Sequence, residues 1–285
     1  MLNRENGKGK WLTSSIYAYF SLWLHSLRTV LMLIFVLLMT FMLTETTKNS
    51  ISARHFEVYM GETLFKYANN GFNLIMTSVA YMVMMSEIPK RISYQNYAMM
   101  RLSRMKWLCS LIVFCMLIAF LYIIAMFSFS ALFSMSFVSP GDGWSDIERL
   151  ATYENYEFMT PYTSEYIRIM HPMKACVLAL FIQFLFYTTV TFIILVFSLH
   201  EMPTVGIVFC ISMVLLGVTI LFEYLPPFPL LSHFATLSGI ESQVYENKFQ
   251  HIAKCIAGYF VVIALLIALM VHRVKRMDVR FMEKE

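Results

Sequence analysis

Six long runs of apolar residues constrain this chain more than any other feature. A helix of about 20 apolar residues spans the hydrocarbon core of a bilayer, whereas a water-soluble fold of 285 residues cannot bury six such runs. The composition agrees, because only 14% of the residues are charged, against roughly 25% in average soluble domains. We therefore predict an all-α membrane protein with six transmembrane helices. The predicted spans are residues 28–44, 67–86, 107–133, 175–199, 204–222 and 255–271.

The sequence outside these spans predicts one membrane domain with a short polar segment at each end. Residues 1–27 are expected to form a cytoplasmic N-terminus with an interfacial helix, residues 28–272 the six-helix transmembrane domain, and residues 273–285 a basic cytoplasmic tail. Polar stretches between the spans predict three external loops. These loops lie at about 45–66, 137–174 and 223–254.

The placement of lysine and arginine predicts which side of the membrane each loop faces. Most of the 22 basic residues lie before the first span, between the second and third spans, or after the sixth span. Acidic residues concentrate in the three predicted external loops. Because cytoplasmic loops carry an excess of lysine and arginine, we expect a multi-pass protein of the cell membrane with both termini in the cytoplasm. The overall charge of +4 then requires no nucleic-acid partner.

The segment 11–27 (WLTSSIYAYFSLWLHSL) is typical of a helix that lies along the membrane surface. Tryptophan and tyrosine favour the headgroup boundary, and the apolar residues recur at helical spacing. The residues of this apolar face are Leu12, Ile16, Tyr19, Phe20, Trp23 and Leu27. We expect an interfacial helix on the cytoplasmic leaflet that turns into the membrane near 26–29. An extension of the first span is the alternative.

The loop 86–106 (SEIPKRISYQNYAMMRLSRMK) joins the second and third predicted spans and is basic and aromatic. Glu87 and Pro89 are expected to end the second span, because proline does not continue a helix. A short cytoplasmic coupling helix after them would suit docking into the groove of a partner protein. An anchor that only fixes the orientation is an equal alternative. The residues that we assign to partner coupling are Glu87, Lys90, Arg91, Tyr94, Tyr97, Arg101 and Arg104.

A second unusual segment, 223–238, is apolar but contains Pro226, Pro227 and Pro229. Its apolar remainder is too short to span a bilayer, so the pattern indicates a re-entrant or interfacial hairpin. An ordinary external loop packed on the bundle is the alternative.

Polar residues inside a membrane span mark candidate paths for a substrate or an ion. Asn73 and Gln183 are the clearest such residues, and we assign them to a substrate path. Ion-coupled transporters usually bury a carboxylate at mid-membrane, and the predicted spans contain none there. The sequence therefore argues against secondary transport.

The chain carries no recognised catalytic or metal-binding motif. The zinc-protease, nucleophile-elbow and P-loop patterns are absent, and the seven histidines are scattered without the spacing of a metal site. The five cysteines fall within or beside apolar runs, which favours buried thiols over disulfides or zinc ligands. We expect no enzymatic activity, no cofactor and no metal in this chain itself.

The order of these parts resembles the membrane subunit of a type-2 ATP-binding-cassette (ABC) exporter. In that family an interfacial helix precedes the first span, a cytoplasmic coupling helix joins the second and third spans, and a broken segment lies between the fifth and sixth. The matching candidates are 11–27, 87–106 and 223–238, and the ending VKRMDV at 274–279 is similar to the basic tail of the family. One departure is the segment 137–174, which is longer than the usual link between the third and fourth spans.

The resemblance implies a permease subunit without its own ATPase. Such a subunit works with a second permease copy or a paralogue and with two cytoplasmic ABC ATPase subunits. The ATPase subunits bind ATP and Mg and move the coupling segment around 94–104. The cargo would be an amphipathic, peptide or lipid-like substrate that is moved outward. The alternative function is a membrane scaffold or sensor whose acidic, tyrosine-rich segment 142–166 binds an extracellular ligand. An intramembrane enzyme ranks last, because the sequence shows no paired catalytic residues at membrane depth.

Overall fold

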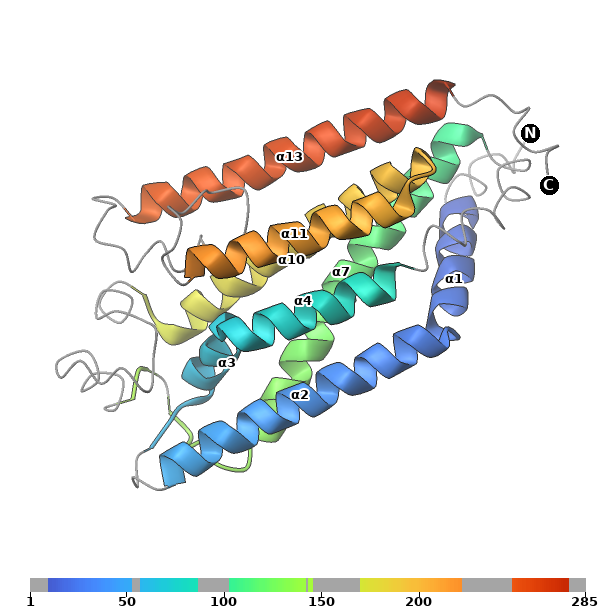
Figure 1. The fold of residues 1–285 in the computed structure, drawn as a ribbon. Coiled ribbons are helices and arrows are strands. Elements are labelled where there is room, and N and C mark those ends of the chain that lie inside the picture. Colours follow the sequence, from blue (N-terminus) through green and yellow to red (C-terminus); the bar gives the residue numbers. More distant parts are fainter. Residues whose placement is uncertain are drawn as a thin grey trace, which may run out of the picture.

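The computed structural model describes residues 10–52, 57–86, 103–141, 143–145, 170–221 and 248–276. Over these residues the protein consists of eight helices and contains no strand (Figure 1). The all-α prediction is therefore confirmed for this part of the chain. The helices are α1 (Lys10–Leu24), α2 (Leu27–Ser52), α3 (Met60–Asn69), α4 (Gly71–Met85), α7 (Arg104–Ser134), α10 (Pro172–Leu199), α11 (Pro203–Leu221) and α13 (Lys248–Arg276).

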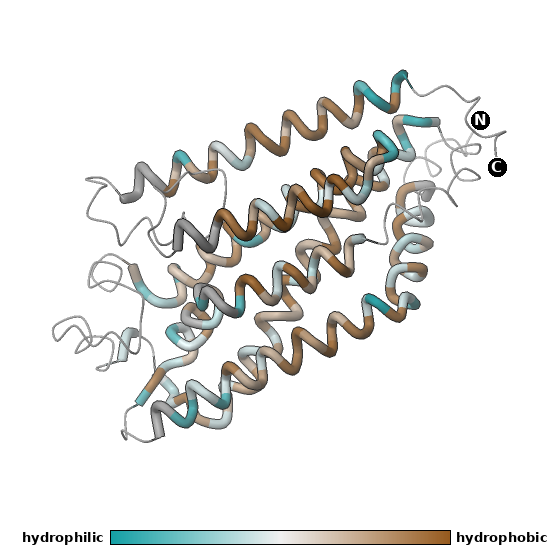
Figure 2. The backbone as a smooth tube through the Cα atoms, viewed as in Figure 1, coloured by the Kyte–Doolittle hydropathy of each residue, from teal (hydrophilic) through white to brown (hydrophobic). Residues whose placement is uncertain are grey.

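The long helices form a bundle with two distinct ends (Figure 1). At one end lie α1, the starts of α2 and α7, and the ends of α4 and α13; we call it the α1 end. At the opposite end lie α3, the start of α10 and the end of α2; we call it the α3 end. Figure 2 shows that apolar residues occupy the middle of the long helices, while polar residues lie mainly near their ends. A bilayer requires this banding, because its core is apolar and its two surfaces are polar.

Four helices are long and apolar enough to cross a membrane: α2, α7, α10 and α13. They fit a multi-pass membrane protein, as predicted. The span of α10 is 78% buried and that of α13 only 17%, so α10 is the central helix and α13 a peripheral one. The apolar stretches described for α4 and α11 are shorter, at Asn73–Met85 and Pro203–Leu216. The six-span arrangement therefore stays a prediction.

The helices α2 and α13 are longer than the spans predicted for them. α2 continues to Ser52, past Glu45, where we ended the first span because of its charge. The helix accommodates polar residues in this last part because their hydroxyls are hydrogen-bonded. Thr46 and Thr47 donate to main-chain carbonyls one turn earlier, at 2.8 and 2.9 Å. The segments predicted as external loops 45–66 and 223–254 and as the tail 273–285 are consequently helical in part.

The predicted span 67–86 is broken into two helices. α3 ends at Asn69 and α4 begins at Gly71, because Asn70 between them is extended, with φ −66° and ψ 117°. The Asn70 side chain caps α4 by accepting a hydrogen bond from the main-chain N–H of Asn73 at 2.9 Å. Asparagine and glycine both favour helix ends, so this Asn-Asn-Gly sequence explains the break.

The first helix, α1, is set at an angle to α2, with a bend at residues 25–26 (Figure 1). It packs against α7, where the Tyr19 ring lies 5.4 Å from the Phe114 ring. Most of the predicted apolar face of α1 is buried or half-buried, and the exception is Leu27, which is 72% exposed. Burial raises the pKa of the Tyr19 hydroxyl above its ordinary value, so this contact stays neutral. The apolar face of α1 therefore lies largely against protein.

Gly206 allows α11 to lie close to α10 near the α1 end. A Cβ atom at this position would lie 2.8 Å from the Cβ atom of Phe197, which is too close for packed carbons. Gly206→Ala should therefore lower the free energy of unfolding by about 1–3 kcal/mol, although this change in an open helix stabilises by about 1 kcal/mol. Thermal unfolding tests this, with Val205→Ala at the exposed neighbouring position as the control. A more stable Gly206→Ala protein would contradict the close approach.

Candidate functional site: a polar seam and a helix break

Buried polar side chains form a line inside the bundle. They recur every four residues along α4 and again along α10, and residues four apart lie on one face of a helix. We call these six residues the polar seam. They are Asn73, Thr77 and Tyr81 on α4 and Gln183, Tyr187 and Thr191 on α10, each at most 2% exposed.

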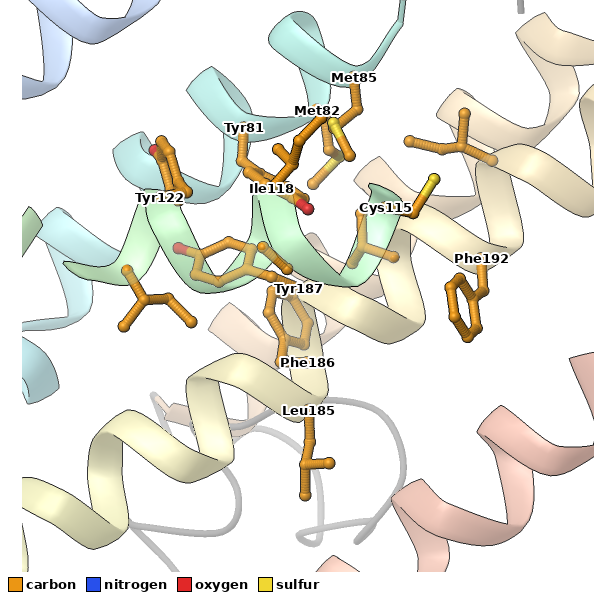
Figure 3. Packing of buried hydrophobic residues seen from close by; sticks show 14 of the residues in the cluster. Tyr81, Met82, Met85, Cys115, Ile118, Tyr122, Leu185, Phe186, Tyr187 and Phe192 are labelled. Carbon is orange, nitrogen blue, oxygen red and sulfur yellow. The ribbon is translucent and has the colours of Figure 1, made fainter. Parts of the chain in front are cut away.

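Three tyrosine rings meet at the centre of the seam (Figure 3). Tyr122 of α7 joins Tyr81 and Tyr187, and the ring centroids of the three pairs lie 4.6, 4.9 and 5.4 Å apart. The Tyr122 hydroxyl donates to the main-chain oxygen of Thr77 at 2.7 Å, and the hydroxyl oxygens of Tyr81 and Thr191 lie 2.6 Å apart. These neutral contacts tie α4, α7 and α10 together, each hydrogen bond contributing about 1 kcal/mol in a membrane bundle.

One end of the seam meets the break between α3 and α4. A helix leaves its last carbonyls without intrahelical donors, and a buried break must supply other donors. The side-chain amide of Asn73 donates to the Tyr67 carbonyl at 3.1 Å, and that of Gln183 donates to the Ala68 carbonyl at 2.7 Å. The structure therefore brings together the two residues predicted for a substrate path, at a place where they stabilise the broken helix.

The oxygens of the same two amides have no hydrogen-bond partner. Asn73 Oδ1 and Gln183 Oε1 are both buried and unpaired. A buried acceptor without a donor costs about 1–3 kcal/mol, and such atoms are uncommon in native proteins. Because two of them lie beside consecutive carbonyls of α3, the break is the strongest candidate for a binding site among the described residues.

Most residues predicted for partner coupling lie outside the part of the chain that the structure describes. Those outside it are Glu87, Lys90, Arg91, Tyr94, Tyr97 and Arg101. Arg104 is described: it is the first residue of α7 and is half-buried. The residues on either side of the segment 87–102 are described as well: Ser86 is the C-cap of α4 and Ser103 precedes α7, both at the α1 end. The hairpin predicted at 223–238 also lies outside the described residues.

The α1 end is closely packed around the start of α7 and the end of α4. Trp107 of α7 is fully buried, and so are Met84 and Met85 in the last turn of α4. At the same end, the Arg273 side chain of α13 donates to the Leu199 carbonyl at 3.2 Å, which satisfies the end of α10. A displacement of the segment between α4 and α7 would therefore act directly on buried, packed residues.

The α3 end contains a buried carboxylate that we did not predict. Glu62 is fully buried, and its two oxygens accept hydrogen bonds from the main-chain N–H and the hydroxyl of Ser145, each at 3.0 Å. Nearby, the Trp144 and Phe65 rings lie 5.6 Å apart. The residues that precede the segment 146–169 are thereby held against α3. The sequence does not mark Glu62 as buried, because it lies in the predicted external loop 45–66, where a carboxylate is expected to face water.

The tyrosines at the centre of the seam were also missed. A search for uncharged runs does not separate tyrosine from apolar residues. The sequences of α4, α7 and α10 therefore show no polar position at these tyrosines when only charge is considered. The signal that reveals the seam is the spacing of four residues between its polar members on α4 and again on α10.

Metal-binding side chains do not gather in the described part of the chain, where no group of three or more histidine, cysteine or acidic residues converges. The five cysteines are free thiols; Cys109 is exposed and the other four are buried.

Comparisons with protein-family models, with curated proteins and with solved structures give no match for this chain.

Proposed function

We propose that this chain is the permease subunit of a type-2 ABC exporter and moves an amphipathic, peptide or lipid-like substrate outward. The observation that carries the proposal is the position of the two described residues that flank the segment 87–102. Ser86, after α4, and Ser103, before α7, both lie at the α1 end, where α1 packs on α7. A partner bound to the segment between them would act on three helices at once.

Motion of this segment would reach the polar seam through α4. Met84 and Met85 are buried in the last turn of α4, and Tyr81, one turn earlier, contacts Tyr187 of α10 with 4.6 Å between ring centroids. Cytoplasmic ATPase subunits would bind ATP and Mg. Only a difference in ATP affinity between two states of the complex can supply the energy that moves the helices. The permease itself performs no bond chemistry.

The charge of the α1 end supports a cytoplasmic position for it, because lysine and arginine favour that side of a membrane. The basic residues of the described helices at this end are Lys10, Arg28, Arg104, Lys106, Arg273, Lys275 and Arg276. In this proposal both termini are cytoplasmic, and α4 and α11 serve as the second and fifth of six spans. A second permease copy or a paralogue completes the transporter, as in the family that the sequence resembles.

Purification of the tagged full-length chain from its native membrane tests the proposal. A cassette ATPase should accompany the chain, and the purified complex should hydrolyse ATP. An unrelated multi-pass protein with the same tag is the control for non-specific recovery. Recovery of the intact chain without any ATPase, under conditions that preserve other membrane complexes, would contradict the exporter assignment.

A membrane scaffold or sensor is the second candidate, and the contacts at the α3 end favour it. Glu62 and Phe65 of α3 contact Ser145 and Trp144, which belong to the segment 142–166, so a ligand bound by this segment would act on α3. Deletion of that segment separates the two functions. A sensor would lose its response, whereas an exporter that still transports its substrate after the deletion would exclude the sensor.

A further inference from the structure

We propose that the break between α3 and α4 binds one small monovalent cation, such as sodium or potassium. Its ligands are the side-chain oxygens of Asn73 and Gln183 together with the main-chain oxygens of Tyr67 and Ala68. The site is independent of the exporter proposal, because it rests only on the geometry of the break.

The nitrogens of the two amides fix their oxygens at the break. Asn73 Nδ2 and Gln183 Nε2 donate to the carbonyls of Tyr67 and Ala68, at 3.1 and 2.7 Å. Because the oxygen and the nitrogen of an amide share one carbon, both side-chain oxygens lie at the break too. Neither oxygen has a partner, and the two residues are only 2% and 0% exposed. Each unpaired amide oxygen thus belongs to a side chain whose nitrogen binds a main-chain oxygen of α3.

The oxygen atoms at the break favour a positive ligand. The carbonyl end of α3 carries roughly half a negative charge and the N–H end of α4 a similar positive charge, and the Asn70 side chain accepts from one of these N–H groups, so the oxygens and not the helix dipoles decide the sign of the ligand. A carbonyl oxygen has two lone pairs, so Tyr67 and Ala68 can each accept a second interaction. Broken membrane helices use such carbonyl ends to coordinate sodium ions in transporters. One cation would satisfy both unpaired amide oxygens.

The ligand set favours a monovalent ion over a divalent one. Calcium and magnesium sites in proteins usually include carboxylates, whereas the groups that meet at the break are neutral amide and main-chain oxygens. Glu62 lies in the first turn of α3, and its oxygens bind Ser145. A water molecule that donates to both amide oxygens is the competing occupant. Unlike a cation, water binds equally well whichever salt is present.

Thermal unfolding of the full chain in lipid nanodiscs distinguishes the two occupants. The melting temperature should be about 5 °C higher in sodium or potassium chloride than in N-methyl-D-glucamine chloride of equal ionic strength. The rise should saturate with the salt concentration, because one site is filled. Radiolabelled sodium or rubidium should bind at one ion per chain.

Two variants of α10 make the test specific. Gln183→Leu removes a ligand and should lose the salt-dependent rise. Thr188→Val removes a different buried, unpaired oxygen and should keep it. Equal melting temperatures in all three salts would overturn the proposal, and so would a rise that does not saturate or that Gln183→Leu retains. If Gln183→Leu does not fold, the salt series on the unaltered chain decides alone.

Discussion

Replacement of both Arg101 and Arg104 by glutamate should abolish the association with the ATPase subunits while the chain still inserts and folds. The expected loss of affinity is about 100-fold or more, since reversal of charges at a complementary interface removes favourable pairs and adds repulsion. The fold should tolerate the change, because Arg104 is the first residue of α7. A glutamate at a helix N-terminus stabilises the helix by about 0.3–1 kcal/mol.

Two measurements check this result. Recovery of the ATPase with the tagged chain reports the association, and thermal unfolding reports the fold. The matched control is the double variant Lys275→Glu and Arg276→Glu, which reverses two exposed charges at the same end of the bundle but outside the loop 86–106 that contains Arg101 and Arg104. Full recovery of the ATPase with the Arg101 and Arg104 variant would exclude these residues from coupling.

Tyr187→Ala should lower the free energy of unfolding by about 3–5 kcal/mol, as large aromatic-to-alanine changes in packed cores do. Tyr187 is fully buried and its ring contacts those of Tyr81 and Tyr122, so its removal opens a cavity between three helices. Tyr187→Phe should cost about 1 kcal/mol or less, since its hydroxyl makes a long hydrogen bond of 3.3 Å to Thr77 Oγ1. Denaturant unfolding in mixed micelles measures both.

The comparison of these two variants identifies what holds the centre of the seam. A small loss for Tyr187→Phe beside a large one for Tyr187→Ala would assign the stability to the packing of the ring. Equal losses would contradict that assignment and place the stability in the hydroxyl instead.

The apolar runs of the sequence predicted the central helices well. The runs 107–133 and 175–199 lie within three residues of the observed ends of α7 and α10, because they contain no charge or turn signal that interrupts them. The length of α2 was underestimated because a charge was taken as the end of the span. A helix that leaves the membrane can continue through such residues, since water and headgroups solvate them.

The candidate site was predictable only in part. Asn73 and Gln183 stood out as polar residues in apolar runs, and the sequence around Asn70 contains a turn signal that we did not use. The contact between Gln183 and the Ala68 carbonyl joins residues 115 positions apart. Local periodicity carries no information on such a pair, because the packing of α10 on α3 decides it.

The order of the helices along the chain means that the polar seam is synthesised before the last two helices. Its members on α4 and α10 and the Tyr122 ring on α7 all precede residue 200, whereas α11 and α13 follow it. During synthesis the seam can therefore close before the last two helices leave the ribosome. They would then be added to a core that already holds its buried polar groups away from lipid. A chain that stops after α10 would still contain both partners of every hydrogen bond within the seam.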